Sequence, residues 1–172
     1  MKALFLILSL VIGHFSYVVG NICIFSSKAQ TKTTNSLKPN DEDNIREVVF
    51  RKLFNPNGSV QKQNANAYYI AIGNHNKLND PDEKFIERFK SYKPPVKKFS
   101  GAKIEKEGVF NKKTGDKGLV FAVTSIKTIS ENEVEVRGNY YKNAREAAGS
   151  IFTVKRIEKK WVVTNHQIDW LT

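Results

Sequence analysis

Cysteine is nearly absent from this chain of 172 residues, and its scarcity excludes several kinds of chemistry. The single cysteine, Cys23, lies in an apolar N-terminal segment. If that segment is removed, the remaining chain has no disulfide, no thiolate nucleophile and no thiolate zinc ligand. The three histidines show no His-Glu-x-x-His spacing, and the acidic residues show no EF-hand spacing. We therefore expect neither a metal site nor a cofactor.

Signature loops and repeats are also missing. No Gly-x-x-x-x-Gly-Lys-Ser/Thr loop is present to bind nucleotide phosphates, and no Gly-x-Ser-x-Gly elbow is present to expose a nucleophilic serine. No repeat of about 20–50 residues is visible, which excludes a solenoid. Hydrophobic residues make up 40% of the chain, which is enough for one packed core. A single small globular domain is the class that remains.

The first residues predict an export signal. A positive start at Lys2 is followed by residues 3–27, which contain no Asp, Glu, Lys or Arg. This is the pattern of a secretory signal peptide, and we place the leader at residues 1–29, with a second candidate cleavage site near Gly20. About 20 apolar residues are enough to cross a bilayer, so an uncleaved membrane anchor over residues 3–27 is the alternative.

One domain is expected beyond the leader. Residues 30–40 are polar and are predicted to form a flexible tether, and the domain is placed at residues 41–172. Export of a chain without disulfides favours the periplasm, the envelope or the exterior of a bacterium over a eukaryotic secretory route.

Basic residues outnumber acidic ones, 28 against 17, which gives a formal net charge of +11. Outside the cytoplasm, such a protein meets anionic lipids, wall polymers and polysaccharides. The sequence shows no strand face on which arginines alternate with aromatic residues, so we expect no nucleic-acid binding. The candidate anion-binding residues form a lysine-rich hairpin tip, namely Lys112, Lys113 and Lys117.

Two helices are predicted before the long strands. Residues 40–54 carry an apolar stripe at helical spacing, with Asn40 or Asp41 as the N-cap. A second helix is predicted from Asp80, as its N-cap, to the Pro94-Pro95 pair. Between the helices, residues 67–72 form a short apolar and aromatic run that predicts a buried strand.

After Pro95 the chain is predicted to consist of strands. Their ranges are residues 96–104, 118–128, 133–141, 150–158 and 160–170. Inward-facing positions of the third strand are Val134, Val136, Gly138 and Tyr140, and Gly138 suits a bulge or bend. Short connections make successive strands antiparallel. The predicted class is therefore α+β, with N-terminal helices packed on a strongly curved antiparallel sheet.

The order of these elements resembles the cystatin-like cone of the nuclear-transport-factor-two-like superfamily. The similar segments are Lys160-Trp161-Val162-Val163 with the residues up to Trp170, and residues 68–73, 85–96 and 138–141. Over about residues 41–172, these segments are similar to a group of uncharacterised exported bacterial proteins. The resemblance implies helices lying in the concave face of a bent sheet. It implies no single activity, because the superfamily contains isomerases, dehydratases, transport factors and binding domains.

Enzymes of that superfamily work at the mouth of the cone. The candidate pocket-lining residues are Tyr68, Tyr69, Tyr140, Tyr141, His166 and Asp169. Adjacent tyrosines on a strand point to opposite faces, so at most one of each pair can line a cavity. Alternation also separates His166 from Asp169, which argues against a dyad. By the same rule, His166 is expected to share its face with Val162, Thr164, Ile168 and Trp170.

The favoured hypothesis is a non-enzymatic exported domain, because no acid–base pair, metal set or phosphate loop can be assembled. Its concave face would bind a small apolar molecule, a peptide or a protein. One alternative is a pocket enzyme of the isomerase or dehydratase type, which would use a tyrosine and a carboxylate. Another is an envelope protein that docks on an anionic polymer through its lysines. Membrane contact is expected only through an uncleaved leader, and a homodimer is left open.

Overall fold

The computed structural model of this protein describes residues 37–55, 65–74 and 76–172. All of them belong to one unit, residues 34–172. The predicted leader, residues 1–29, and most of the predicted tether lie outside the described residues. Within the described ranges, no helix is long and apolar enough to span a membrane.

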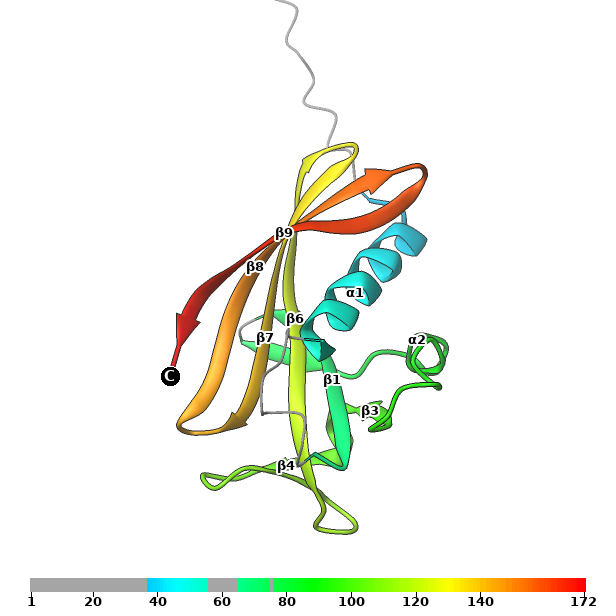
Figure 1. The fold of residues 1–172 in the computed structure, drawn as a ribbon. Coiled ribbons are helices and arrows are strands. Elements are labelled where there is room, and N and C mark those ends of the chain that lie inside the picture. Colours follow the sequence, from blue (N-terminus) through cyan, green and yellow to red (C-terminus); the bar gives the residue numbers. More distant parts are fainter. Residues whose placement is uncertain (1–36, 56–64, 75) are drawn as a thin grey trace, which may run out of the picture. The chain divides into compact units, whose positions relative to one another are not determined.

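The described chain combines one helix of 16 residues, two short helical elements, and strands of 3 to 14 residues. Its helical elements are α1 (Pro39–Phe54), α2 (Glu83–Glu87) and the 3-10 turn η2 (Phe99–Gly101). Its strands are β1 (Ala67–Asn74), β2 (Lys77–Asn79), β3 (Val96–Lys98), β4 (Ala102–Ile104), β5 (Val109–Asn111), β6 (Lys117–Ser130), β7 (Glu133–Asn143), β8 (Glu146–Ile157) and β9 (Lys160–Leu171). The predicted α+β class is confirmed, but the described chain has one N-terminal helix, α1, on the sheet where more than one was expected. Figure 1 shows α1 lying across one face of the long strands, which curl around it without closing into a barrel.

The described strands form one sheet, whose main path runs in the order β2-β1-β6-β7-β8-β9. Strands β6 to β9 form the predicted antiparallel meander. However, β1 runs parallel to both β6 and β3, so the expectation of a wholly antiparallel sheet is wrong. The chain between β1 and β6 is long and carries α2 and the β4–β5 hairpin. A connection of that length lets the chain cross over and return in the same direction, which a tight turn does not allow.

Helix α1 begins one residue before its predicted start. Its N-cap is Lys38, without a side-chain cap, so the expected capping by Asn40 or Asp41 is wrong. Pro39 occupies the first turn, where its missing N–H costs nothing and its fixed φ suits the helix. Asp41 instead accepts hydrogen bonds from Arg156, at 2.7 Å, and from the indole of Trp161, at 3.2 Å. These bonds attach the start of α1 to the turn between β8 and β9.

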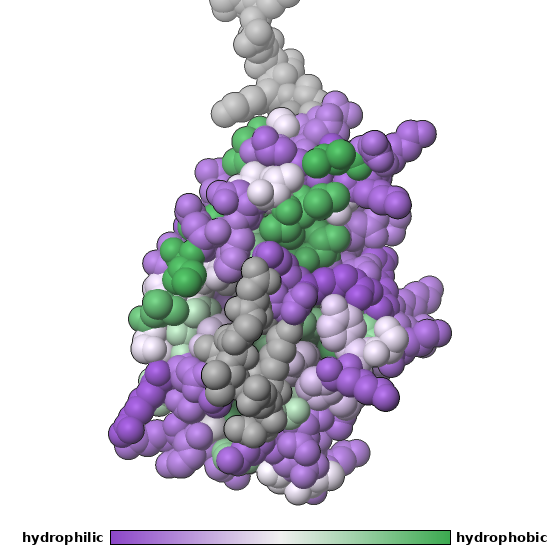
Figure 2. All heavy atoms as spheres, in the orientation of Figure 1, coloured by the Kyte–Doolittle hydropathy of each residue, from purple (hydrophilic) through white to green (hydrophobic). Residues whose placement is uncertain are grey.

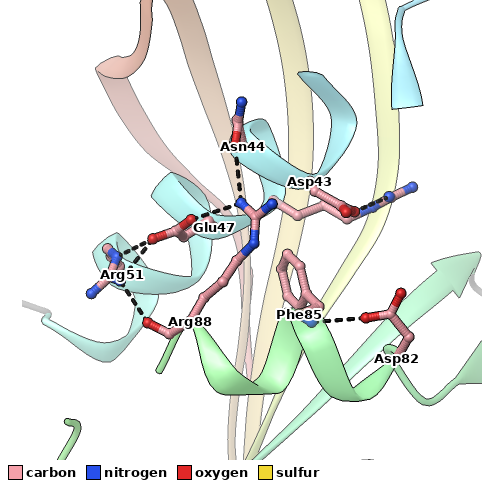
Figure 3. Close-up of polar contacts among 8 residues, drawn as sticks. Asp43, Asn44, Glu47, Arg51, Asp82, Phe85 and Arg88 are labelled. Atoms are coloured by element: carbon pink, nitrogen blue, oxygen red, sulfur yellow. Dashed lines mark hydrogen bonds and ion pairs between the residues drawn. The ribbon is translucent and has the colours of Figure 1, made fainter. Parts of the chain in front are cut away.

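The second helix is shorter than predicted. Its N-cap is Asp82, which accepts a hydrogen bond from the Phe85 N–H at 2.7 Å (Figure 3). Asp80, the predicted cap, accepts instead from the Ser100 N–H at 2.7 Å. The aspartate two residues further along is thus the one that begins the helix, and the expected capping box at Asp80 does not form.

Beyond Glu87 the chain continues in tighter turns. The N–H of Phe89 bonds to the carbonyl of Ile86, and the N–H of Tyr92 bonds to the carbonyl of Phe89, both at 2.9 Å. These are three-residue bonds of the 3-10 type. The expectation of a helix continuing to Pro94 is therefore wrong, although its aromatic residues do pack inward. Phe89 is buried, and its ring lies 5.5 Å from the ring of Phe54 in α1.

Ionic contacts hold the α2 segment against α1 (Figure 3). The Arg88 guanidinium donates to Glu47 and to Asn44, both at 2.9 Å. Arg51 pairs with the same Glu47 and donates to the Arg88 carbonyl at 2.9 Å. Charge-assisted bonds of this kind are stronger and more directional than neutral ones. They fix the short helix beside the long one, together with the aromatic contacts of Phe85 and Phe89 with Phe50.

The main core lies between α1 and the concave face of the sheet. Its buried members are Ile45, Val49, Phe50, Phe54, Tyr68, Ile70, Phe85, Phe89, Leu119, Phe121, Val123, Val134, Val136, Phe152, Val154 and Trp161. A smaller cluster on the opposite face contains Ala67, Tyr69, Ala102, Val109 and Val120, with Phe99 and Tyr141 packed against it. We call these the concave core and the convex cluster.

Gly138 lies where α1 packs closely against β7. The predicted inward alternation of its strand is confirmed, since Val134 and Val136 are fully buried. A Cβ atom on Gly138 would lie 3.1 Å from Leu53 Cδ1 and 3.1 Å from a ring carbon of Phe152. The register shift next to it lies in the partner strand, between Val123 and Ser125. Gly138 thus makes room for the helix, while the neighbouring strand carries the bulge.

Candidate functional site

A cavity of about 330 Å³ lies between the C-terminal end of α1 and the concave face of the sheet. Its apolar lining consists of Leu53, Phe54, Leu119, Phe121, Ala148, Phe152, Ile168 and Leu171. Its polar lining consists of Lys52, Asn55, Tyr140, Ser150 and His166. No Asp or Glu of the described chain lines it. Small-molecule sites in proteins have volumes of about 300–1,000 Å³ and mainly apolar walls with a few polar groups, which is the character of this cavity.

The cavity exists because small residues face the end of a helix. Alternation along β8 directs Ala148, Ser150 and Phe152 toward the concave side. The first two are too small to fill the space next to them. Helix α1 ends at Phe54, so this helix does not extend over this part of the sheet. Further along β8, Val154 is fully buried beneath the helix, and there the concave face is filled.

A bulge in β9 decides which residues reach the cavity. Val163 pairs with Val154, and Asn165 pairs with Thr153, so Thr164 is an extra residue between these pairs. One extra residue reverses the inward and outward positions that follow it. His166 pairs with Phe152 and therefore points to the concave side. The concave positions before the bulge are those of Trp161 and Val163, which pack into the concave core.

Because of this bulge, most of the residues predicted to share a face with His166 do not do so. Strict alternation placed Val162, Thr164 and Trp170 on its face, and this is wrong. Val162 pairs with Lys155 and is exposed, while Trp170 lies against Gly149, outside the cavity lining. Ile168, from the same prediction, does line the cavity with His166.

His166 is held in place by two residues of β8. Its ring stacks on the ring of Phe152, with centroids 4.6 Å apart and an angle of 6° between the planes. Its Nε2 atom lies 3.0 Å from Ser150 Oγ. Burial lowers the pKa of His166, and the nearby ammonium of Lys52 lowers it further. The imidazole is therefore neutral at pH 7, and it presents a hydrogen-bonding group without a charge.

Lys52 supplies the positive charge at this site. It lies in the last turn of α1 and makes no ion pair with any residue that the structure describes. Arg51, its neighbour in the chain, forms an ion pair with Glu47. A lysine in the last helical turn also interacts favourably with the partial negative charge of the helix end, which is about half an elementary charge. The full charge of the ammonium exceeds that partial charge, so the site remains positive.

Tyr140 is the tyrosine that lines the cavity. Burial raises its pKa above the ordinary value, and the charge of Glu146 adds to the shift. The hydroxyl is therefore protonated at neutral pH, and a phenol in that state cannot act as a base. Glu146 itself pairs with Lys142 and lies outside the cavity lining.

The other predicted pocket residues lie elsewhere. Tyr68 is buried in the concave core, with its ring 5.2 Å from that of Phe54, and burial raises the pKa of its hydroxyl. Tyr69 and Tyr141 belong to the convex cluster. Asp169 forms an ion pair of 2.5 Å with Arg137 and does not line the cavity. The structure therefore brings together Tyr140 and His166 from the six predicted residues.

The predicted anion-binding lysines lie on the hairpin that joins β5 to β6. Lys112 and Lys113 are exposed in its turn, and Lys117 is the first residue of β6. The Asn111 side chain accepts hydrogen bonds from the N–H groups of Lys113, at 2.8 Å, and Thr114, at 3.2 Å. These bonds shape the turn and leave the lysine side chains in solvent. The three lysines are not part of the cavity lining.

Lys52 and Ser150 were missed by sequence reasoning. A signal for Ser150 existed, because Ala148, Ser150, Phe152 and Val154 alternate with the strand period and only one of them is polar. A lone polar residue at an inward position of a strand indicates either a water or a ligand contact. Lys52 offered no such signal, since basic residues are common in the last turn of any helix.

In residues 37–55, 65–74 and 76–172, no group of three or more His, Cys, Asp or Glu side chains is placed to hold a metal ion. Comparisons of the chain with protein-family models, with curated proteins and with solved structures give no match.

Proposed function

We propose that this protein is a non-enzymatic binding domain that holds a small apolar molecule in the cavity at the end of α1. The observation that carries the proposal is a cavity of ligand size, about 330 Å³, whose walls are mainly apolar and whose few polar groups include Ser150 and His166, 3.0 Å apart. Apolar walls supply affinity through the hydrophobic effect, and a few polar groups orient the ligand.

A catalytic reading of the Ser150–His166 contact has little support. A serine nucleophile needs a base that is oriented by a third group, and donors that stabilise an oxyanion. His166 is stacked on Phe152, and no carboxylate of the described chain lines the cavity. Ser150 lies in mid-strand, between Gly138 on one side and Ile168 on the other, so its backbone is part of the sheet ladder. The pair therefore serves better as a polar anchor for a ligand.

The expected affinity is moderate. At ~0.5 kcal/mol per non-hydrogen atom, a ligand of about a dozen such atoms would bind with a Kd on the order of 10–100 µM. Binding of this strength is measurable with an uncharged apolar dye such as N-phenylnaphthylamine, whose fluorescence rises when it leaves water. The dye is larger, with about 17 such atoms, so by the same rule we expect it to bind with a Kd on the order of 1 µM and to be released when an apolar competitor is added.

A cavity-filling variant tests where the ligand sits. Ala148→Phe places a ring in the cavity and should reduce dye binding at least tenfold. Ala147→Phe is the matched control, because Ala147 is an equally buried neighbour on the opposite face of β8. Unchanged binding in a folded Ala148→Phe protein would contradict the proposal.

If both variants fail to fold, the wild-type protein still tests the proposal through its thermal stabilisation by a ligand. A ligand that binds only the folded state raises the melting temperature as its concentration rises above Kd. Absence of both the thermal shift and the dye signal would show that the cavity takes no apolar ligand.

We also propose that the domain is a cystatin-like cone and that the chain is exported. The cone is supported by α1 lying in the concave face of a curled antiparallel meander. Export is supported by the uncharged run of residues 3–27 after Lys2. N-terminal sequencing of the protein recovered from its native compartment tests export, since a mature chain starting near Gln30 is expected. A chain starting at Met1 in the membrane fraction would favour the uncleaved anchor.

A further inference from the structure

We infer that the ligand of this cavity is a monocarboxylate with a short hydrocarbon chain, whose carboxylate lies against Lys52, Ser150 and His166. The inference rests on the proposed binding function and specifies the chemical class of the ligand. Two properties of the site carry it, namely the size of the apolar part and the charge of the polar part.

The volume of the cavity fixes the length of the chain. If one methylene takes about the ~30 Å³ of a water molecule in the liquid, then 330 Å³ accommodates a chain of about ten carbons. Aromatic and aliphatic side chains line this space, including Leu119, Phe121 and Phe152. A flexible hydrocarbon adapts to such a wall, and each buried methylene contributes to the affinity.

The charge of the polar side selects an anion. Among the lining residues that the structure describes, Lys52 is charged and none is acidic. A cationic ligand would meet the Lys52 ammonium without a compensating carboxylate. The end of α1 carries a partial negative charge of about one half, which is smaller than the charge of Lys52 and is partly met by the Asn55 N–H bonded to the Lys52 carbonyl.

Ser150 and His166, the neutral groups beside Lys52, can together offer one hydrogen-bond donor to a carboxylate oxygen. Ser150 Oγ and His166 Nε2 are 3.0 Å apart, so one of them donates to the other. When the Nε2–H donates to Oγ, the serine hydroxyl proton is free to donate outward. A carboxylate accepts hydrogen bonds only, and it would select this arrangement. One oxygen would then face the hydroxyl while the other faces the ammonium.

A phosphate fits the same site poorly. Phosphate recognition uses a bidentate arginine or several backbone N–H groups in addition to a lysine. Here Arg51, which precedes Lys52 in the chain, is paired with Glu47, and the Ser150 backbone is hydrogen-bonded within the sheet. One ammonium and one hydroxyl suffice for a monoanion and not for a dianion.

Three competitors of equal chain length test the inference on the full-length protein. Decanoate, decanol and decylamine are each titrated against bound N-phenylnaphthylamine at pH 7.5 and low salt. We expect decanoate to bind about five- to tenfold more tightly than decanol, and decylamine to bind more weakly than both. The preference for decanoate should shrink at high salt, because Lys52 lies at an exposed position.

Lys52→Met removes the charge and keeps most of the apolar stem. We expect this variant to bind decanoate and decanol equally, with decanol binding changed less than twofold. Lys90→Met is the control, because it removes the same charge from an exposed turn outside the cavity lining and should retain the preference.

The outcomes separate the two proposals. Binding of decanol and decanoate with equal affinity by the wild type would overturn the carboxylate inference and leave the apolar binding function standing. An equal loss of both ligands in folded Lys52→Met would also overturn it, since the lysine would then act through packing. Binding of none of the three ligands would overturn both proposals.

Discussion

The two faces of the sheet are built from the same strands, yet one is filled and the other is hollow at one end. On the convex side, the ring of Tyr69 packs so closely against Gly118 that a Cβ atom there would lie 2.6 Å from a ring carbon. On the concave side, Ala148 and Ser150 face the end of α1 and leave a cavity. The comparison shows that a large side chain over a glycine closes a sheet face, whereas small residues opposite a helix terminus open one.

The largest expected effect comes from emptying the filled face. Tyr69 is fully buried, and Tyr69→Ala should lower the free energy of unfolding by about 3–5 kcal/mol. Tyr140→Ala, at the half-buried cavity wall, should cost ~1 kcal/mol, because less surface is lost there. Urea denaturation of both variants measures the difference. Equal losses would mean that the two faces are packed alike.

A smaller effect is expected from adding a methyl group at the glycines of the two faces. In Gly118→Ala the new Cβ would lie 2.6 Å from the Tyr69 ring and 3.0 Å from the Ala67 carbonyl oxygen. Neither group can move freely, so a loss of about 1–3 kcal/mol is expected. In Gly138→Ala the two closest contacts are Leu53 and Phe152, at 3.1 Å each, and both side chains border the cavity and have room to shift. We expect this variant to stay within ~1 kcal/mol of the wild type.

These two glycine variants are compared by thermal melting under identical conditions. A greater loss for Gly138→Ala than for Gly118→Ala would show that the cavity wall is as rigid as the convex cluster. In that case, the room for movement that we ascribe to Leu53 and Phe152 would not exist.

The smallest effect concerns the pH dependence of stability. The pKa of folded His166 is lowered by burial and by Lys52, so the unfolded chain binds more protons just below pH 6.5. Stability is therefore lost as the pH falls from about 6.5 toward the folded pKa. Tyr140 also lines the cavity, and burial raises its pKa, so its hydroxyl does not titrate in this range.

His166→Gln removes this contribution. The stability of the wild type relative to the variant should rise with pH across this window and level off above it. Denaturation midpoints at several pH values between 5 and 7.5 measure the slope. A parallel pH dependence in the two proteins would show that His166 is not the group that titrates.

The spacing of apolar residues in the sequence predicted the elements that bury one face, because burial repeats with the period of the helix or strand. The α1 stripe and the alternation of Val134, Val136 and Gly138 were readable because one face of each element is buried. The length of the second helix was not, since its aromatic residues also suit 3-10 spacing. Pairing of β1 with β6 joins segments far apart in the chain, and its parallel direction leaves no mark in either strand alone.

The candidate site was predicted in part for the same reason. Tyr140 and His166 drew attention as polar aromatic residues on strands, and both line the cavity. The neighbours of His166 were misassigned, because a single extra residue at Thr164 reverses the alternation and nothing in its identity reveals it. Lys52 reaches the cavity through the place where α1 ends, which depends on the tertiary packing of Phe54 as much as on its own type.

The interruptions of β9 also affect how its outer edge meets other molecules. Figure 2 shows apolar side chains at the left of the view, where Figure 1 draws the end of this strand, and Ile168 and Leu171 are 59% and 67% exposed. A straight apolar edge of this kind would invite strands of other chains to add to the sheet. Here the register of β9 shifts at Thr164 and at Asp169, so an added strand could pair regularly only with the short stretch between them. The bulge at Thr164, which turns His166 inward, thus also disfavours aggregation through the edge of the sheet.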